Sequence, residues 1–225
     1  MSTNRTAQLI VQSMYVALGV VAIFGSFGLY DADFDGTFYT YFTNLSNYLC
    51  VGVMFAELVQ TARRKGNGFV TLSPLLKFIC VIAIMLTCCV FNFILAGAPD
   101  RDPLDNYKVT CILFHTVLPL LFVADWLAFY RHGVVKWTFP LISTIFPLLF
   151  VAFVFIRAAI FPSAENLYPY FFLDPGQQGV DGVIRWIVIL LITFIAFGYL
   201  LMALDRALDR RSATVATSLK AAALD

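Results

Sequence analysis

The sequence predicts an all-α integral membrane protein built as a bundle of six transmembrane helices. Of its 225 residues, 60% are hydrophobic and only 13% are charged, and the mean hydropathy is +0.83, which is too apolar for a soluble domain of this size. Six apolar runs are long enough to cross a bilayer, because about 20 helical residues span the roughly 30 Å hydrocarbon core. Backbone polar groups in that core must be satisfied internally, which favours helices.

Each predicted span is bounded by charged residues, Gly or Pro. The spans are expected near residues 8–30, 38–61, 74–96, 109–130, 138–160 and 182–204. The chain is therefore predicted to form one six-helix domain over residues 1–205. Residues 206–225 are small, polar and Ala-rich, and we expect them to form a frayed cytoplasmic tail.

The distribution of Lys and Arg predicts the orientation. Of the 15 Lys and Arg residues, 11 fall on the same side as the N-terminus, which leaves four on the opposite side: Arg101, Lys108, Arg157 and Arg185. The positive-inside rule then places both termini in the cytoplasm. The net charge of +1 offers no basic field, so the expected partners are membrane lipids and not nucleic acid. These patterns leave the oligomeric state open.

Cysteine and histidine usage argues against disulfides, metals and haem. All five cysteines lie inside apolar runs, where cysteine usually acts as a small buried hydrophobe. A catalytic zinc needs three protein ligands and a membrane haem generally needs two histidines, whereas this chain has only His115 and His132. We therefore expect no cofactor. The first apolar run lacks a cleavage site and is interpreted as a retained span.

The fourth span carries two ionisable residues, His115 and Asp125, which are costly in hydrocarbon and mark a functional hypothesis by default. At about 1.5 Å per helical residue, His115 lies roughly 10 Å below the outer end of its span. The same arithmetic brings polar residues of the second and third spans to similar depths. This predicted belt comprises Thr43, Ser46, Asn47, Asn92 and His115.

Asp125 follows His115 by ten residues, about 15 Å along the helix, and cannot orient its imidazole. We expect the partner of His115 to come from another helix, with four candidates: Tyr41, Asn47, Tyr48 and Asn92. Asp125 is expected to join a structural charge cluster near the inner surface with Glu57, Lys77 and Arg131.

A hydroxyl and an imidazole at one depth are the minimum for a nucleophile activated by a general base. Thr and Asn are also common interhelical hydrogen-bond partners in membranes. The same belt therefore fits a second reading, a non-enzymatic lipid-binding or transport protein whose polar residues only hold the helices together.

Four segments carry a family resemblance: YFTNLSN (41–47), HTVLPLLFVADWLAF (115–129), FPLLFVAFVFIRAAI (146–160) and YPYFFLD (168–174). Together they resemble the androgen-induced-gene family of multi-pass membrane proteins and its bacterial relatives, over roughly residues 40–205. The resemblance implies hydrolysis of fatty acid esters of hydroxy fatty acids, or similar lipid esters, in a bacterial cytoplasmic membrane. The family's essential threonine and histidine fall on Thr43 and His115.

Depth and charge, together with more distant resemblances, suggest roles for the remaining candidates. A more distant group resembles lipid acyltransferases with a Cys/His pair, and a threonine at position 43 argues against that chemistry. Asn47 and Asn92 are expected to bind the oxyanion or to orient the catalytic pair. The candidates for substrate binding are Ser46, Arg157 and Arg185, although ion pairs with residues such as Asp174 or Asp181 are favoured for the two arginines. The segment 168–172 is interpreted as an aromatic anchor or short lid.

Overall fold

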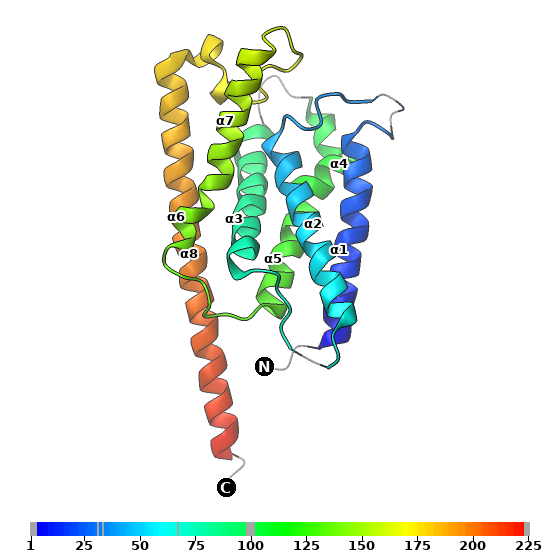
Figure 1. Ribbon diagram of the computed structural model, residues 1–225, viewed down its shortest axis with the longest axis vertical. Coiled ribbons are helices and arrows are strands. Elements are labelled where there is room, and N and C mark those ends of the chain that lie inside the picture. The colour runs from blue at the N-terminus through cyan, green and yellow to red at the C-terminus, as the bar shows by residue number, and fades with distance from the viewer. Residues whose placement is uncertain (1–3, 31, 33, 67, 98–101, 223–225) are drawn as a thin grey trace.

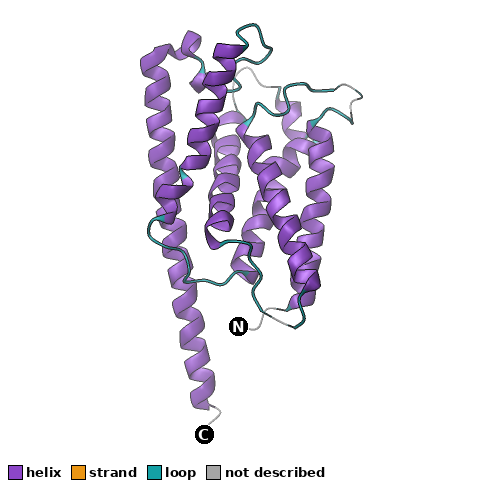
Figure 2. Cartoon of the chain, viewed as in Figure 1, coloured by secondary structure: helices purple, strands orange, loops and turns teal. Residues whose placement is uncertain are grey.

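Six helices long and apolar enough to cross a membrane make up the computed structural model, which describes residues 4–30, 32, 34–66, 68–97 and 102–222, with side chains to residue 210 (Figure 1). The protein is therefore a multi-pass integral membrane protein, and the described chain is helical apart from its connections (Figure 2). The six spans are Arg5–Ser26, Phe42–Arg63, Pro74–Leu95, Val109–Phe129, Phe139–Ile160 and Pro175–Arg210.

Four of the spans are not a single continuous helix, and the sixth has a kink at Gly179, whose φ of 66° and ψ of 164° are non-helical. The third joins α3 (Pro74–Val90) to a π-helical turn, η1 (Phe91–Leu95). The fourth span consists of α4 (Val109–Ile112), the π-helical turn η3 (Leu113–Val117) and α5 (Leu118–Phe129). The fifth span consists of α6 (Phe139–Ser143) and α7 (Ile145–Ile160). Two short 3-10 turns, η2 (Pro103–Tyr107) and η4 (Phe171–Leu173), lie in the connections.

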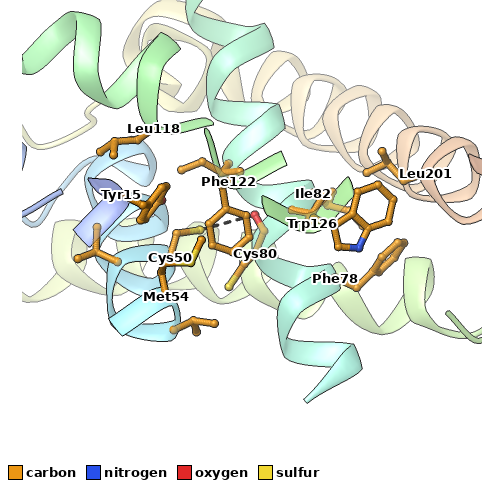
Figure 3. Packing of buried hydrophobic residues seen from close by; sticks show 14 of the residues in the cluster. Tyr15, Cys50, Met54, Phe78, Cys80, Ile82, Leu118, Phe122, Trp126 and Leu201 are labelled. Carbon is orange, nitrogen blue, oxygen red and sulfur yellow. Dashed lines mark hydrogen bonds between the residues drawn. The ribbon is translucent and has the colours of Figure 1, made fainter. Parts of the chain in front are cut away.

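The helices form two groups. α1 (Arg5–Ser26), α2 (Phe42–Arg63), α3 and α5 pack on one another, whereas α6, α7 and α8 (Pro175–Ala222) lie along one side of that group (Figure 1). Aromatic and sulfur side chains fill the core between α1, α2, α3 and α5, including Tyr15, Cys50 and Phe122 (Figure 3). Gly19 permits the close approach of α1 and α2, because a Cβ there would collide with Val51.

Some helices begin or end at other residues than predicted, because capping side chains and glycines determine where a helix starts and stops. α1 begins three residues early because the Asn4 side chain accepts hydrogen bonds from the first-turn N–H groups. It ends before residue 30, since Gly28 adopts φ 75°. α8 continues to Ala222, so the expected frayed tail is helical in the structure. No Gly or Pro follows residue 205 to stop it. Arg101 and residues 223–225 lie outside the described residues.

The predicted charge cluster is present and is fully buried near the cytoplasmic end of the predicted topology. Lys77 Nζ lies 2.7 Å from Glu57 Oε2 and 2.7 Å from Asp125 Oδ2. Its ammonium also lies 4.3 Å from the centre of the Phe122 ring. Arg131 is exposed and does not share this burial. The cluster joins α2, α3 and α5, which supports the structural role expected for Asp125.

A second polar contact fixes the α5–α6 connection to α8. The carboxylate of Asp205, which is fully buried, accepts hydrogen bonds from the backbone N–H groups of Gly133 and Val135. His132 Nδ1 lies 3.0 Å from Asp205 Oδ1, and His132 Nε2 lies 3.2 Å from the Leu127 carbonyl. Both neighbours accept hydrogen bonds, so both ring nitrogens need a proton. The geometry therefore favours the imidazolium form.

This contact predicts a pH-dependent stability. Burial alone would lower the pKa of His132, but Asp205, the Leu127 carbonyl and the nearby Asp209 raise it above the ordinary value. The stabilisation is complete below the unfolded value of about 6.5, and it is lost as the pH rises through the higher folded pKa. We expect the melting temperature to fall over that window, and a His132→Gln variant to lack this dependence. An identical pH profile for the two proteins would contradict the imidazolium assignment.

Candidate active site

Thr43 lies in the first turn of α2, where the helix leaves its backbone N–H groups without helical partners. The residue before the helix, Tyr41, makes no side-chain capping bond. Instead, the Tyr170 hydroxyl of the α7–α8 connection accepts a hydrogen bond from the Thr43 N–H at 3.4 Å. Thr43 is buried, with 8% of its surface exposed. The predicted nucleophile therefore begins a long helix and contacts a distant loop.

His115 lies on the π-helical turn η3, whose local hydrogen bonding follows from Pro119. Pro119 has no N–H, so the His115 carbonyl loses its usual partner four residues later. The Leu118 N–H bonds to the Leu113 carbonyl in the π pattern, which leaves the Phe114 carbonyl without its helical donor as well. Two carbonyls beside the imidazole are thus available to side chains of other helices.

Two asparagines take these carbonyls. Asn47 Nδ2 donates to the Phe114 carbonyl at 3.2 Å and to the Thr43 carbonyl at 2.9 Å, which ties the turn to α2. Asn92 Nδ2, on η1, donates to the His115 carbonyl at 3.2 Å and to the Cys88 carbonyl at 2.9 Å. Both residues therefore hold the backbone of the π-helical turn and do not contact the imidazole through these bonds. An oxyanion role would require these bonds to break.

The imidazole of His115 is oriented by its own helix. Its Nδ1 lies 2.9 Å from the Cys111 carbonyl, and the ring stacks on Phe91 with centroids 3.6 Å apart. Nδ1 thus takes a backbone carbonyl one turn away on its own helix, a kind of partner that the expectation of a side chain from another helix did not consider, whereas the stacked Phe91 belongs to η1. Since a carbonyl only accepts, Nδ1 carries the proton in the neutral ring and Nε2 carries the lone pair.

Thr43 and His115 line the same cavity of about 660 Å³. Its walls also include Asn44, Thr110 and Cys111, together with the charged side chains of Asp35, Asp105 and Lys108. This volume lies in the range of small-molecule sites. The sequence-based depth argument thus names two residues that the structure brings to one cavity.

A second, apolar pocket of about 80 Å³ meets the first at Thr43. Its walls come from α2, α3, α7, α8 and η4, and they are almost entirely aliphatic and aromatic, as at Phe150, Leu173 and Phe194. Leu148 on its wall is also exposed on the lipid-facing side of α7. Thr43 and Tyr170 line both spaces. If an elongated molecule placed its apolar part in the pocket and its polar end in the cavity, the bond between the two parts would lie beside these two hydroxyls.

Ser46 takes a structural position behind Thr43. It is fully buried, and its hydroxyl donates to the Thr43 carbonyl at 2.9 Å. The Thr87 hydroxyl lies 2.9 Å from Ser46 Oγ and must then be the donor between the two. These bonds join α2 to α3, so the structure gives Ser46 no substrate-facing position.

The two arginines predicted to bind substrate also lie elsewhere. Arg157, on α7, is buried and donates to the carbonyls of Glu165, Asn166 and Leu167. Its guanidinium therefore holds the α7–α8 connection in place, a role that neither substrate binding nor the expected ion pairs anticipated. Arg185 is exposed on α8, away from the walls of the two cavities.

Tyr170 is the functional candidate that the sequence analysis passed over, because it placed 168–172 only as an aromatic anchor or lid. Cys111 is another, since its Sγ lies 3.4 Å from His115 Nδ1 on the cavity wall. The i, i+4 spacing of Cys111 and His115 was a readable signal for that contact. Within the described residues, no three His, Cys, Asp or Glu side chains gather to hold a metal ion. The comparisons with protein-family models, curated proteins and solved structures find no match to this chain.

Proposed function

We propose that the protein is a membrane-embedded hydrolase that cleaves long-chain lipid esters, with Thr43 as nucleophile and His115 as general base. One observation carries the proposal: Thr43 lies where an apolar pocket meets a polar cavity whose wall also contains His115. The resemblance to the androgen-induced-gene family points to the same two residues. No cofactor is required by this chemistry.

The residues support a two-step ester hydrolysis. His115 Nε2 accepts the proton as Thr43 Oγ attacks the ester carbonyl, and the carbonyl electrons move to its oxygen. Collapse of the intermediate releases the alcohol, which takes the proton from His115, and leaves an acyl group on Thr43. Water then attacks this acyl-enzyme with His115 again as base, and His115 returns that proton to Thr43 Oγ as the fatty acid is released. The polar cavity gives water and the departing alcohol a path.

The two spaces also suggest how the ester is placed. The part of its acyl chain next to the ester would occupy the apolar pocket between α3, α7 and α8, and the rest would extend past exposed residues such as Leu148 into the bilayer. Its alcohol would lie in the polar cavity. With the termini in the cytoplasm, as the Lys and Arg distribution predicts, this cavity opens on the outer side.

We expect hydrolysis to depend steeply on the apolar length of the ester. Purified protein in lipid nanodiscs is incubated with a library of esters of increasing acyl length, and released fatty acids are measured by mass spectrometry. Long-chain esters should be cleaved and short soluble ones poorly, because an apolar pocket rewards buried methylenes. A Thr43→Ala protein serves as the matched control, and Ser46→Ala as a control for a buried neighbouring hydroxyl.

Each other outcome of that assay has a meaning. Equal turnover of short soluble esters would contradict lateral entry into the apolar pocket. Acyl groups found on a second lipid instead of as free acid would indicate an acyltransferase. Binding of the esters without any product would support the non-enzymatic lipid-binding or transport alternative.

A further inference from the structure

The hydroxyl of Tyr170 occupies the position next to the predicted nucleophile. It accepts a hydrogen bond from the Thr43 N–H at 3.4 Å, and both residues line the two cavities. A donor–acceptor distance of 3.4 Å is longer than the usual value of about 2.9 Å for an N–H···O bond. The contact with the N–H is therefore weak enough to be exchanged for a stronger acceptor.

The surroundings of Tyr170 make it a fixed hydrogen-bond donor. Its ring stacks on Phe172 with centroids 5.0 Å apart and an interplanar angle of 4°, and it packs edge-on against Phe150 and Tyr41. Burial raises the pKa of Tyr170 to about 12, although the neighbouring Thr43 acts in the opposite direction. The hydroxyl keeps its proton at neutral pH and is held in one place.

The α7–α8 connection has features that position this ring. Arg157 binds three successive carbonyls of the connection, at Glu165, Asn166 and Leu167. Asn166 in turn donates from Nδ2 to the Thr40 hydroxyl just before α2. The loop is thus tied to α7 through Arg157 and to Thr40, three residues before Thr43. Tyr170 is one of the residues shared by the two cavities.

We propose that Tyr170 is a further catalytic residue, whose hydroxyl donates a hydrogen bond to the oxyanion formed when Thr43 attacks the ester carbonyl. The proposal rests on the hydrolase function proposed above. The carbonyl oxygen enters beside the first turn of α2 and displaces the Tyr170 oxygen from the Thr43 N–H. It then accepts from that N–H and from the Tyr170 O–H.

The step leaves all protons accounted for. The bond from Thr43 Oγ to the carbonyl carbon forms while the carbonyl π electrons move to oxygen, and the Thr43 proton goes to His115. Tyr170 keeps its proton throughout. The first-turn N–H adds the favourable end of the α2 dipole, which stabilises negative charge at this position.

The test compares four proteins in nanodiscs on one long-chain ester: wild type, Thr43→Ala, Tyr170→Phe and Tyr168→Phe. Tyr168 lies in the same segment and packs on Phe155, so it controls for general effects on the loop. We expect Tyr170→Phe to lower kcat by about a hundredfold or more with KM little changed, as loss of one oxyanion donor does. Tyr168→Phe should behave as wild type. Counting active sites with a fluorophosphonate corrects kcat for any unfolded fraction.

The outcomes separate this inference from the function on which it rests. Wild-type kcat in Tyr170→Phe, with Thr43→Ala inactive, would overturn the role of Tyr170 alone. A raised KM with unchanged kcat would show that Tyr170 only binds substrate and would also overturn it. Equal turnover by wild type and Thr43→Ala, or none in either, would remove the hydrolase proposal itself.

Discussion

Replacement of Lys77 by methionine is expected to lower the free energy of unfolding by about 3–5 kcal/mol, because it leaves two carboxylates buried without a cation. Lys77 lies 2.7 Å from Glu57 and from Asp125, and the three side chains are at most 4% exposed. Each carboxylate also has a second oxygen, Glu57 Oε1 and Asp125 Oδ1, that is buried without a hydrogen-bond partner among the described residues. Without the ammonium, the cluster must take up protons or unfold.

Two further proteins make this stability measurement decisive. Lys136→Met removes an exposed lysine and should change little. The triple variant Glu57→Gln, Lys77→Met and Asp125→Asn removes the buried charges together and should recover most of the loss. Reversible unfolding in mixed micelles measures all three. If Lys77→Met were as stable as Lys136→Met, the cluster would contribute nothing to the fold.

Thr43→Ala and His115→Ala are each expected to reduce kcat/KM for the preferred ester by at least about a thousandfold, because each removes one half of the nucleophile and base pair. The double variant should be no worse than either single variant, since the two residues act as a unit. Thr43→Ser should keep part of the activity, because it retains the hydroxyl and loses only the methyl that restricts χ1.

Cys111→Ala provides the matched comparison for those variants. Cys111 lies on the same cavity wall, with its Sγ 3.4 Å from His115 Nδ1. The same nitrogen lies 2.9 Å from the Cys111 carbonyl, which requires a proton on Nδ1. A protonated Nδ1 cannot act as base toward the thiol. Cys111→Ala should therefore retain turnover, and its inactivity would favour a Cys/His mechanism.

The six spans were predictable because hydrocarbon length and composition determine them directly. The shared level of Thr43 and His115, which line one cavity, was predictable too, since a helix advances by a constant rise per residue. The same arithmetic separated Asp125 from His115, and the structure places Asp125 against Lys77. The separation of two residues along one helix can therefore be calculated from their sequence numbers alone.

The hydrogen-bond partners of the polar side chains were harder to predict from the sequence. They depend on how each helix is rotated about its axis and on which backbone carbonyls lose their helical donors. Asn47 and Asn92 were recognised at the right depth, but their carbonyl partners follow from Pro119 and the π-helical turns. Charge suggested either a substrate carboxylate or an ion pair for Arg157, whereas its partners are the carbonyls of a loop whose path no pattern predicted. Tyr170 reaches Thr43 across 127 positions of sequence.

The roles of Thr43 and His115 are tested most directly by locating the covalent adduct of a fluorophosphonate probe with peptide mass spectrometry. In wild-type protein in nanodiscs, we expect one adduct, on Thr43, that forms slowly or not at all in His115→Ala. Ser46→Ala and Cys111→Ala should be labelled as wild type is. An adduct on Ser46 or Cys111, or labelling of Thr43 that persists at the full rate in His115→Ala, would contradict the assignment of Thr43 and His115 as nucleophile and base.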